Sequence, residues 1–237
     1  GVAITINPSS LNDIYEKTII EGMTFSVEDN NSGFLAEENY DIIMEKIDWA
    51  DSVVIGPGLG RNHSTQELIK KLVFNISKPI VLDADGLYPF SNKIEILCQR
   101  AFPLIITPHL KELARLLGCN KEMIHSDFSN VITGFRKKFR QVCVVKQVPA
   151  CIMFGNSIRI NTTGNPGLAS AGTGDVLTGI IASLISQGLN CYDAASIGAY
   201  IHGQTSDELV ERKGYRGQLS SDIVEFLPST IRSYERP

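Results

Sequence analysis

The chain has few cysteines, no long apolar run and no excess of positive charge, and each shortage excludes a class of protein. Its five cysteines are irregularly spaced and include no C-x-x-C pair. This argues against a disulfide framework or a zinc site and favours reduced thiols in the cytoplasm. No apolar run approaches the roughly 20 residues that cross a bilayer. The net charge is −4, and the one basic cluster, at residues 136–140, is expected to be a solvated helix face, so no nucleic-acid binding is expected.

The length of 237 residues suffices for one large domain with a substantial core. No repeat, low-complexity tract or long linker divides the chain, so we expect a single domain over residues 1–237. The first residues already read as a strand, and we expect the domain to have begun further upstream.

Short apolar runs alternate with helical patterns along most of the chain. The runs are continuous and rich in Val and Ile, which is typical of strands buried on both faces. They occupy residues 2–6, 52–55, 79–82, 104–106 and 142–145. Helical periodicity is found in residues 37–47, 64–74 and 109–117, and from residue 175 to about residue 209.

This alternation predicts the α/β class, with right-handed βαβ units, a mainly parallel central sheet and helices on both faces. Residues 151–154 and 157–160, joined by Gly155-Asn156, predict a hairpin. The sheet is therefore expected to be mixed at one edge.

The most informative segment is N-P-G-L-A-S-A-G-T-G-D-V-L at residues 165–177. A glycine-rich turn that opens a helix offers free backbone N–H groups and a positive dipole end to an anion. Asp175 falls in the first helical turn, beside whatever anion is bound. It suits a general base or a metal partner. A simple helix-capping role is the alternative.

Two further glycine or carboxylate clusters follow predicted strands, where ligands bind in open α/β sheets. Gly56-Pro57-Gly58-Leu59-Gly60 allows close approach of backbone to a ligand, or forms a tight turn; its spacing is not that of a dinucleotide fingerprint. Asp83 and Asp85 are spaced to hold a divalent cation through water, or Asp85 caps the segment that follows.

The remaining candidates follow the next two strands. His109 stands near a helix start, where it either contacts a ligand or has a structural role. Glu112, three residues on, caps that helix or helps to hold Mg²⁺. Lys146 ends a buried strand and reaches either an anion or the solvent.

These motifs, taken in order, resemble those of the ADP-dependent NAD(P)H-hydrate dehydratases of the ribokinase-like superfamily. The matching segments are V-V-I-G-P-G-L-G, V-L-D-A-D-G-L, I-T-P-H-x-x-E and N-P-G-x-A-x-A-G-T-G-D-V-L-x-G. The resemblance covers nearly the whole chain and implies a ribokinase-like three-layer sandwich. It also implies a repair enzyme that restores hydrated NADH or NADPH to NAD(P)H while converting ADP to AMP and phosphate, with Mg²⁺ as the metal.

The resemblance assigns roles to individual residues. It makes Asp175 the catalytic base and places Asp175 and His109 against the hydrated dinucleotide, together with glycines of the first cluster, Gly56, Gly58 and Gly60. Backbone N–H groups of the helix start are expected to stabilise the transferring phosphoryl group. The expected nucleotide-binding residues are Lys146, Gln147, Val148, Pro149, Ala150, Asn165, Gly172, Thr173 and Gly174. Glu112 is the candidate metal ligand, and a homo-oligomer is expected.

The chain departs from this family's pattern at three places. Residues 146–150 read K-Q-V-P-A, where the family usually has Lys-Gly and then a Thr or acidic residue, which concerns nucleotide choice. Leu110-Lys111 stands in place of a usual Pro-Gly. The family also has a strand, loop and helix ahead of residue 1, and is often fused to an epimerase domain.

Two other functions stay open at this point. An ATP-dependent kinase of the same superfamily, acting on a vitamin precursor, would share G-T-G-D but tends to have Asn where His109 stands. A nucleotide-binding protein without turnover is the third hypothesis.

Overall fold

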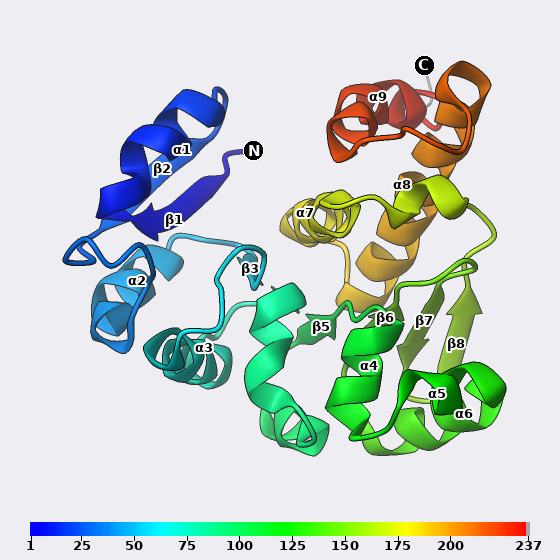
Figure 1. Cartoon of the computed structure of the whole chain (residues 1–237), viewed down its shortest axis with the longest axis horizontal. Helices are drawn as coiled ribbons and strands as arrows, with labels where there is room; N and C mark the ends of the chain where they lie inside the picture. The colour runs from blue at the N-terminus through cyan, green and yellow to red at the C-terminus, as the bar shows by residue number, and fades with distance from the viewer. Residues whose placement is uncertain (236–237) are drawn as a thin grey trace.

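A computed structural model describes residues 1–235 (Figure 1). Its main sheet has six strands in the order β3-β4-β5-β6-β7-β8. The first four are parallel, whereas β7 and β8 form the antiparallel hairpin predicted around Gly155-Asn156. The strand bounds are β3 Val53–Ile55, β4 Ile80–Leu82, β5 Leu104–Ile106, β6 Val142–Val145, β7 Cys151–Phe154 and β8 Ser157–Ile160. The predicted α/β class and the mixed edge are confirmed.

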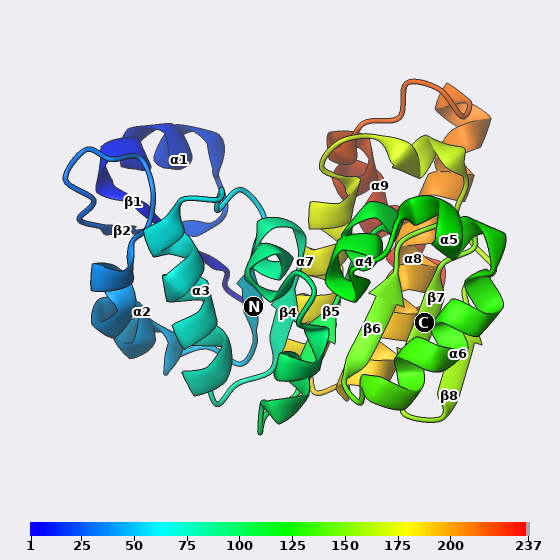
Figure 2. The same cartoon turned by 60° about the horizontal axis from the view of Figure 1, so that its bottom comes forward.

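Helices cover both faces of this sheet (Figures 1 and 2). Alternate strand residues point to opposite sides, and the buried residues accordingly form two clusters. One face is covered by α3, α4 and α6 with short 3₁₀ segments, and the other by α7 and α8, with α9 packed outside them. The helix bounds are α1 Asn12–Thr18, α2 Tyr40–Ile47, α3 His63–Asn75, α4 Leu110–Leu117, α5 Lys121–Ser126, α6 Phe128–Lys138, α7 Thr173–Ser186, α8 Cys191–Lys213 and α9 Ser220–Arg232.

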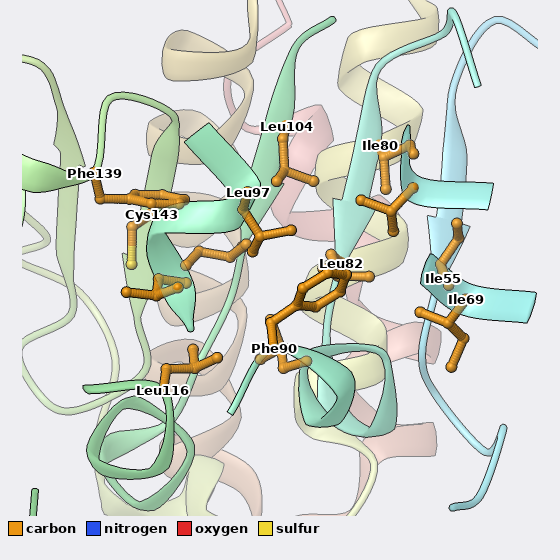
Figure 3. Close-up of a cluster of buried hydrophobic side chains, with 14 of the residues drawn as sticks. Ile55, Ile69, Ile80, Leu82, Phe90, Leu97, Leu104, Leu116, Phe139 and Cys143 are labelled. Carbon is orange, nitrogen blue, oxygen red and sulfur yellow. The ribbon is translucent and has the colours of Figure 1, made fainter. Parts of the chain in front are cut away.

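The larger buried cluster lies between the sheet and the helices of the first face (Figure 3). Ile80, Leu82 and Leu104 project from the central strands toward Phe90 and Leu116, and all five are at most 2% exposed. Burial of this many large aliphatic side chains, at ~25 cal/mol per Å² of apolar surface, is the main force that fixes the central strands. The carboxyl ends of those strands, where the candidate residues lie, are therefore rigidly placed.

The first strand differs from the sequence expectation. Residues 2–6 were expected to be a strand of the central sheet. The structure instead has β1, Ile4–Pro8, which pairs in parallel with β2, Met23–Val27, in a separate two-stranded sheet. Helix α1 connects these strands, so the three elements form a small βαβ unit of their own (blue in Figure 1). Ile4, Thr5 and Ile6 are only partly buried, because this sheet is covered less completely than the central one.

No helix among residues 1–235 is both long enough and apolar enough to span a membrane.

Candidate active site

A cavity of about 550 Å³ lies at the carboxyl ends of β4, β5 and β6. The start of α7 and one side of α8 complete its wall. Helix α7 packs against β3 and β4, and α8 packs against β5, β6 and β7. The sheet and these helices therefore bring residues from five distant segments of the chain to one place, as expected for the strand ends of an α/β sheet.

An ion pair between a buried aspartate and a partly exposed lysine forms the floor of this cavity. Asp83, at the end of β4, is 0% exposed, and its Oδ1 accepts a hydrogen bond of 2.6 Å from Nζ of Lys146. Oδ2 of Asp83 accepts a second bond, of 3.0 Å, from the hydroxyl of Thr178 on α7. Asp83 therefore joins the ends of two strands to α7, whereas its spacing from Asp85 had suggested a cation ligand.

Two glycines at the start of α7 allow this close approach. Gly172 precedes the helix with a φ of +82°, in the left-handed region that favours glycine. A Cβ on Gly174 would lie only 3.1 Å from Nζ of Lys146. The Gly174 N–H finds no acceptor among residues 1–235. A backbone donor and a lysine ammonium group thus lie together at the positive end of a helix dipole, which is an arrangement suited to phosphate.

Asp175 lies in the first turn of α7 and lines the same cavity. Its carboxylate has no hydrogen-bond partner among the described residues. Partial desolvation raises the pKa of Asp175, the negative charge of Asp83 raises it further, and Lys146 opposes both. A carboxylate with a raised pKa and no structural partner is suited to accept a proton from a bound molecule.

His109 and Glu112 form a reciprocal cap on α4. Nδ1 of His109 accepts bonds of 3.1 Å from the N–H groups of Lys111 and Glu112, and Oε2 of Glu112 accepts a 2.9 Å bond from the His109 N–H. Because Nδ1 is an acceptor, the neutral ring carries its proton on Nε2. Desolvation lowers the pKa of His109, so a neutral Nε2–H donor at the cavity is favoured.

The predicted nucleotide segment lies along one wall of the cavity. Lys146, Gln147, Val148 and Ala150 line it, but Pro149 does not. Asn165 also lines it and is held by its own side-chain bonds. Its Nδ2 donates to Ser206 and Asp207, each at 2.9 Å, and its Oδ1 accepts from Gly167 N–H at 2.8 Å.

The glycines of the first cluster do not line the cavity. Gly56 packs against the ion-pair floor instead: with φ at +135°, its Cβ would lie 1.7 Å from the carbonyl oxygen of Asp83. Gly60 donates its N–H to Asp85 at 3.1 Å, and Arg61 donates to the same carboxylate at 3.0 Å. Asp85 thus fixes the glycine segment through these two hydrogen bonds. The contact of Gly56, Gly58 and Gly60 with substrate stays a prediction.

His202 is a titratable cavity residue that the sequence analysis did not identify. His202, on α8, lines the cavity at 6% exposure, and its buried Nε2 has no hydrogen-bond partner among the described residues. Burial lowers the pKa of His202 to about 4, although a hydrogen bond with the Thr173 backbone opposes this. No local signal reveals this residue, because its position in the middle of a long helix carries no motif.

The cavity contains carboxylates but no preformed metal cage. Its carboxylates are Asp83, Glu112 and Asp175. No group of three or more His, Cys, Asp or Glu side chains within residues 1–235 is arranged to hold a metal ion. Mg²⁺ is commonly held by one or two carboxylates together with substrate phosphates and water. The residues present therefore fit a magnesium ion that arrives with a nucleotide, and the role of Glu112 in holding it stays a prediction.

Comparison with known proteins places this chain in a family. Residues 11–229 match the family model described as NAD(P)H-hydrate dehydratase. A bifunctional NAD(P)H-hydrate repair enzyme Nnr from Moorella thermoacetica is 36% identical over 99% of this chain. The chain spans 44% of that relative's length.

Solved structures share the fold. A ribokinase-like superfamily protein from Enterococcus faecalis has a TM-score of 0.80 and 24% identity, over 100% of this chain and 78% of its own. An ADP/ATP-dependent NAD(P)H-hydrate dehydratase from Bacillus subtilis, co-crystallised with ATP and Mg²⁺ and soaked with CoA, has a TM-score of 0.78 and 23% identity, over 99% of this chain and 82% of its own. The predicted ribokinase-like sandwich is confirmed. Because the family model matches most of the sequence and the Moorella relative is similar over nearly all of it, the chain belongs to the NAD(P)H-hydrate dehydratase family.

Proposed function

We propose that the chain restores hydrated NADH and NADPH to NAD(P)H, with conversion of ADP to AMP and phosphate. One observation carries the proposal beyond family membership. Asp175, whose pKa is raised, lies in one cavity with Lys146, Gly174 and the Nε2–H of His109. In the proposed reaction these residues would supply a base, two phosphate-binding groups and a separate donor for the second substrate.

The chemistry begins at the ring hydroxyl of the hydrated nicotinamide. Asp175 accepts the hydroxyl proton as the hydroxyl oxygen attacks the terminal phosphorus of ADP, and the bond from phosphorus to the AMP oxygen breaks. Lys146 and the Gly174 N–H stabilise the charge on the transferring phosphoryl group. The ring C–O bond then breaks, phosphate leaves with both electrons, and loss of a proton from the neighbouring ring carbon restores the dihydropyridine. The net change is loss of water from the ring and hydrolysis of ADP.

Mg²⁺ would neutralise the phosphate charge when it binds with the nucleotide. Glu112, which lines the cavity, would hold it together with the nucleotide phosphates. The protein's own contribution is to orient the two substrates.

ADP is the proposed phosphoryl donor, and ATP is the alternative. The segment that begins at Lys146 supports neither strongly, since Gln147 and Ala150 differ from the resembling family. Parallel assays of phosphate release with ADP alone and with ATP alone decide the point. Turnover with ATP alone would overturn the assignment of ADP.

A vitamin-precursor kinase is the competing function, because it would use the same base and phosphate site. His109 favours the dehydratase, since the kinases tend to have Asn there. The test supplies Mg²⁺ and nucleotide with either hydrated NADH or a vitamin alcohol, and separates the products by chromatography. Restored NADH with AMP supports the proposal, whereas a phosphorylated alcohol supports the kinase. Nucleotide binding without any product would support a binding protein.

We further propose a single domain, a homo-oligomer and a cytoplasmic location. The buried cluster that includes Val27 of β2 continues into the main core, which supports one domain. Ala194, Ala195 and Ala199 of α8 are buried against the sheet, so the small residues of that helix do not themselves require a partner. Sedimentation at micromolar concentration tests the oligomer; a mass near the 26.0 kDa of one chain would contradict it.

A further inference from the structure

A second, shallower hollow of about 320 Å³ adjoins the cavity on the α4 side. The two share three lining residues, His109, Lys146 and Gln147. The hollow is therefore an extension of the candidate active site, bordered by the histidine assigned to the hydrated dinucleotide and by Lys146 and Gln147 of the predicted nucleotide segment.

The lining of this hollow is cationic. Beyond the shared residues it consists of Leu110, Lys111, Lys121 and His125, and contains no carboxylate. Lys121 and His125 are four residues apart on α5 and so lie on one face of that helix. Lys111, in the first turn of α4, adds a third basic side chain.

No nearby carboxylate neutralises these groups. Within residues 1–235, neither Lys111 nor Lys121 has an ion-pair partner, whereas Lys146 is paired with Asp83. Glu112, the neighbour of Lys111, is turned away: one oxygen accepts the His109 N–H at 2.9 Å, and the other lies 3.4 Å from His109 Nε2. The two lysine charges are thus available to an anion.

We propose that this hollow, the cationic annex, binds a phosphate ester group of the hydrated dinucleotide. The proposal rests on the proposed function, since it concerns the substrate of that site. Lysine ammonium groups bind phosphate as point charges, and the dinucleotide is the substrate assigned to His109. Lys111 occupies a position where the resembling family usually has Gly, so the usual family pattern does not include this cation.

Two phosphate esters of the substrate have this chemistry. One is the pyrophosphate, which hydrated NADH and hydrated NADPH share. The other is the 2′-phosphate, which only hydrated NADPH carries. Comparison of the two substrates therefore identifies which ester the annex holds.

The test is the double variant Lys111→Gln/Lys121→Gln of the full chain, assayed with each hydrated dinucleotide at saturating nucleotide. Because Lys111 and Lys121 are exposed, loss of two solvent-screened contacts is expected to raise KM about tenfold, with little effect on kcat. A rise confined to hydrated NADPH assigns the annex to the 2′-phosphate, and an equal rise for both substrates assigns it to the pyrophosphate.

The control is Lys137→Gln/Lys138→Gln in the last turn of α6. It removes two positive charges, as the annex variant does, from residues that line neither the cavity nor the hollow. Unchanged KM values in the annex variant, or changes equal to those of this control, overturn the proposal. Binding of NADPH and NADH, measured by calorimetry, separates the two levels of inference. If the wild-type protein is inactive but binds NADPH or NADH more tightly than the annex variant does, the proposed function is refuted and the annex proposal stands. If the wild-type protein is active and the annex variant binds as tightly as wild type, the annex proposal is refuted and the proposed function stands.

Discussion

Nζ of Lys146 lies 2.6 Å from the fully buried carboxylate of Asp83, directly beside the start of α7. The pair acts on both predicted functional side chains: Lys146 lowers the pKa of Asp175 and of His109, and Asp83 raises both. Removal of Lys146 would leave the buried charge of Asp83 without its partner, which typically costs ~3–5 kcal/mol of stability, so such a variant would confuse folding with catalysis. A milder perturbation of Lys146 is available at Gly174.

The Gly174→Ala variant is expected to lower kcat/KM about tenfold with little loss of stability. The added methyl group would lie 3.1 Å from Nζ of Lys146, so the ammonium group must shift, and small displacements at a reacting site are costly in rate. The matched control is Gly179→Ala in the same helix, where the methyl group meets nothing within 4 Å. That control should gain about 0.5–1 kcal/mol of stability and keep wild-type activity. Equal activity in the two variants would contradict the placement of Lys146.

The Asp175→Asn variant is expected to lose about 10²–10⁴-fold in kcat while its thermal unfolding stays close to wild type. The carboxylate has no structural partner to lose, so its removal leaves the fold intact. Because the pKa of Asp175 is raised, the acid limb of the wild-type kcat profile should lie at higher pH than for an ordinary aspartate. Near wild-type turnover in the variant would show that another group is the base.

The His109→Ala variant is expected to weaken the hydrated dinucleotide more than ADP, as measured by calorimetry. His109 also caps α4, so the alanine variant should lose ~0.5–2 kcal/mol of stability. His109→Asn is the matched control, because Asn is a good helix cap that lacks the ring donor. It should recover stability without recovering dinucleotide affinity. Equal loss of affinity for both ligands would refute a role confined to the dinucleotide.

The buried side chain of His202 is expected to make the folded protein less stable in acid. Burial lowers its pKa in the folded state to about 4, whereas an unfolded histidine titrates near ~6.5. Between these values the unfolded chain binds the proton and the folded chain does not. The free energy of unfolding should therefore fall by ~1.4 kcal/mol per pH unit as pH drops through this window. Denaturant titrations of wild type and His202→Gln from neutral pH to pH about 4 test this, since the variant should lack that part of the slope.

The central strands and the motif residues at their ends were predictable from sequence, because continuous Val and Ile runs identify buried strands and ligands bind at their carboxyl ends. The placement of β1 was not, because an apolar run does not say which strand it pairs with. The pairing of Asp83 with Lys146 joins residues 63 positions apart, and the packing of Gly56 on Asp83 likewise depends on tertiary contact. His202 was missed for the same reason: its environment is created by the docking of α8.

The most direct test of the account follows the oxygen of the substrate hydroxyl. Hydrated NADH prepared with oxygen-18 in that hydroxyl is incubated with the protein, ADP and Mg²⁺, and the released phosphate is analysed by mass spectrometry. If Asp175 activates the hydroxyl to attack phosphorus, each phosphate released with a restored NADH carries one labelled oxygen. Label found in water, with unlabelled phosphate, would show that ADP hydrolysis and dehydration are separate events and would contradict the account.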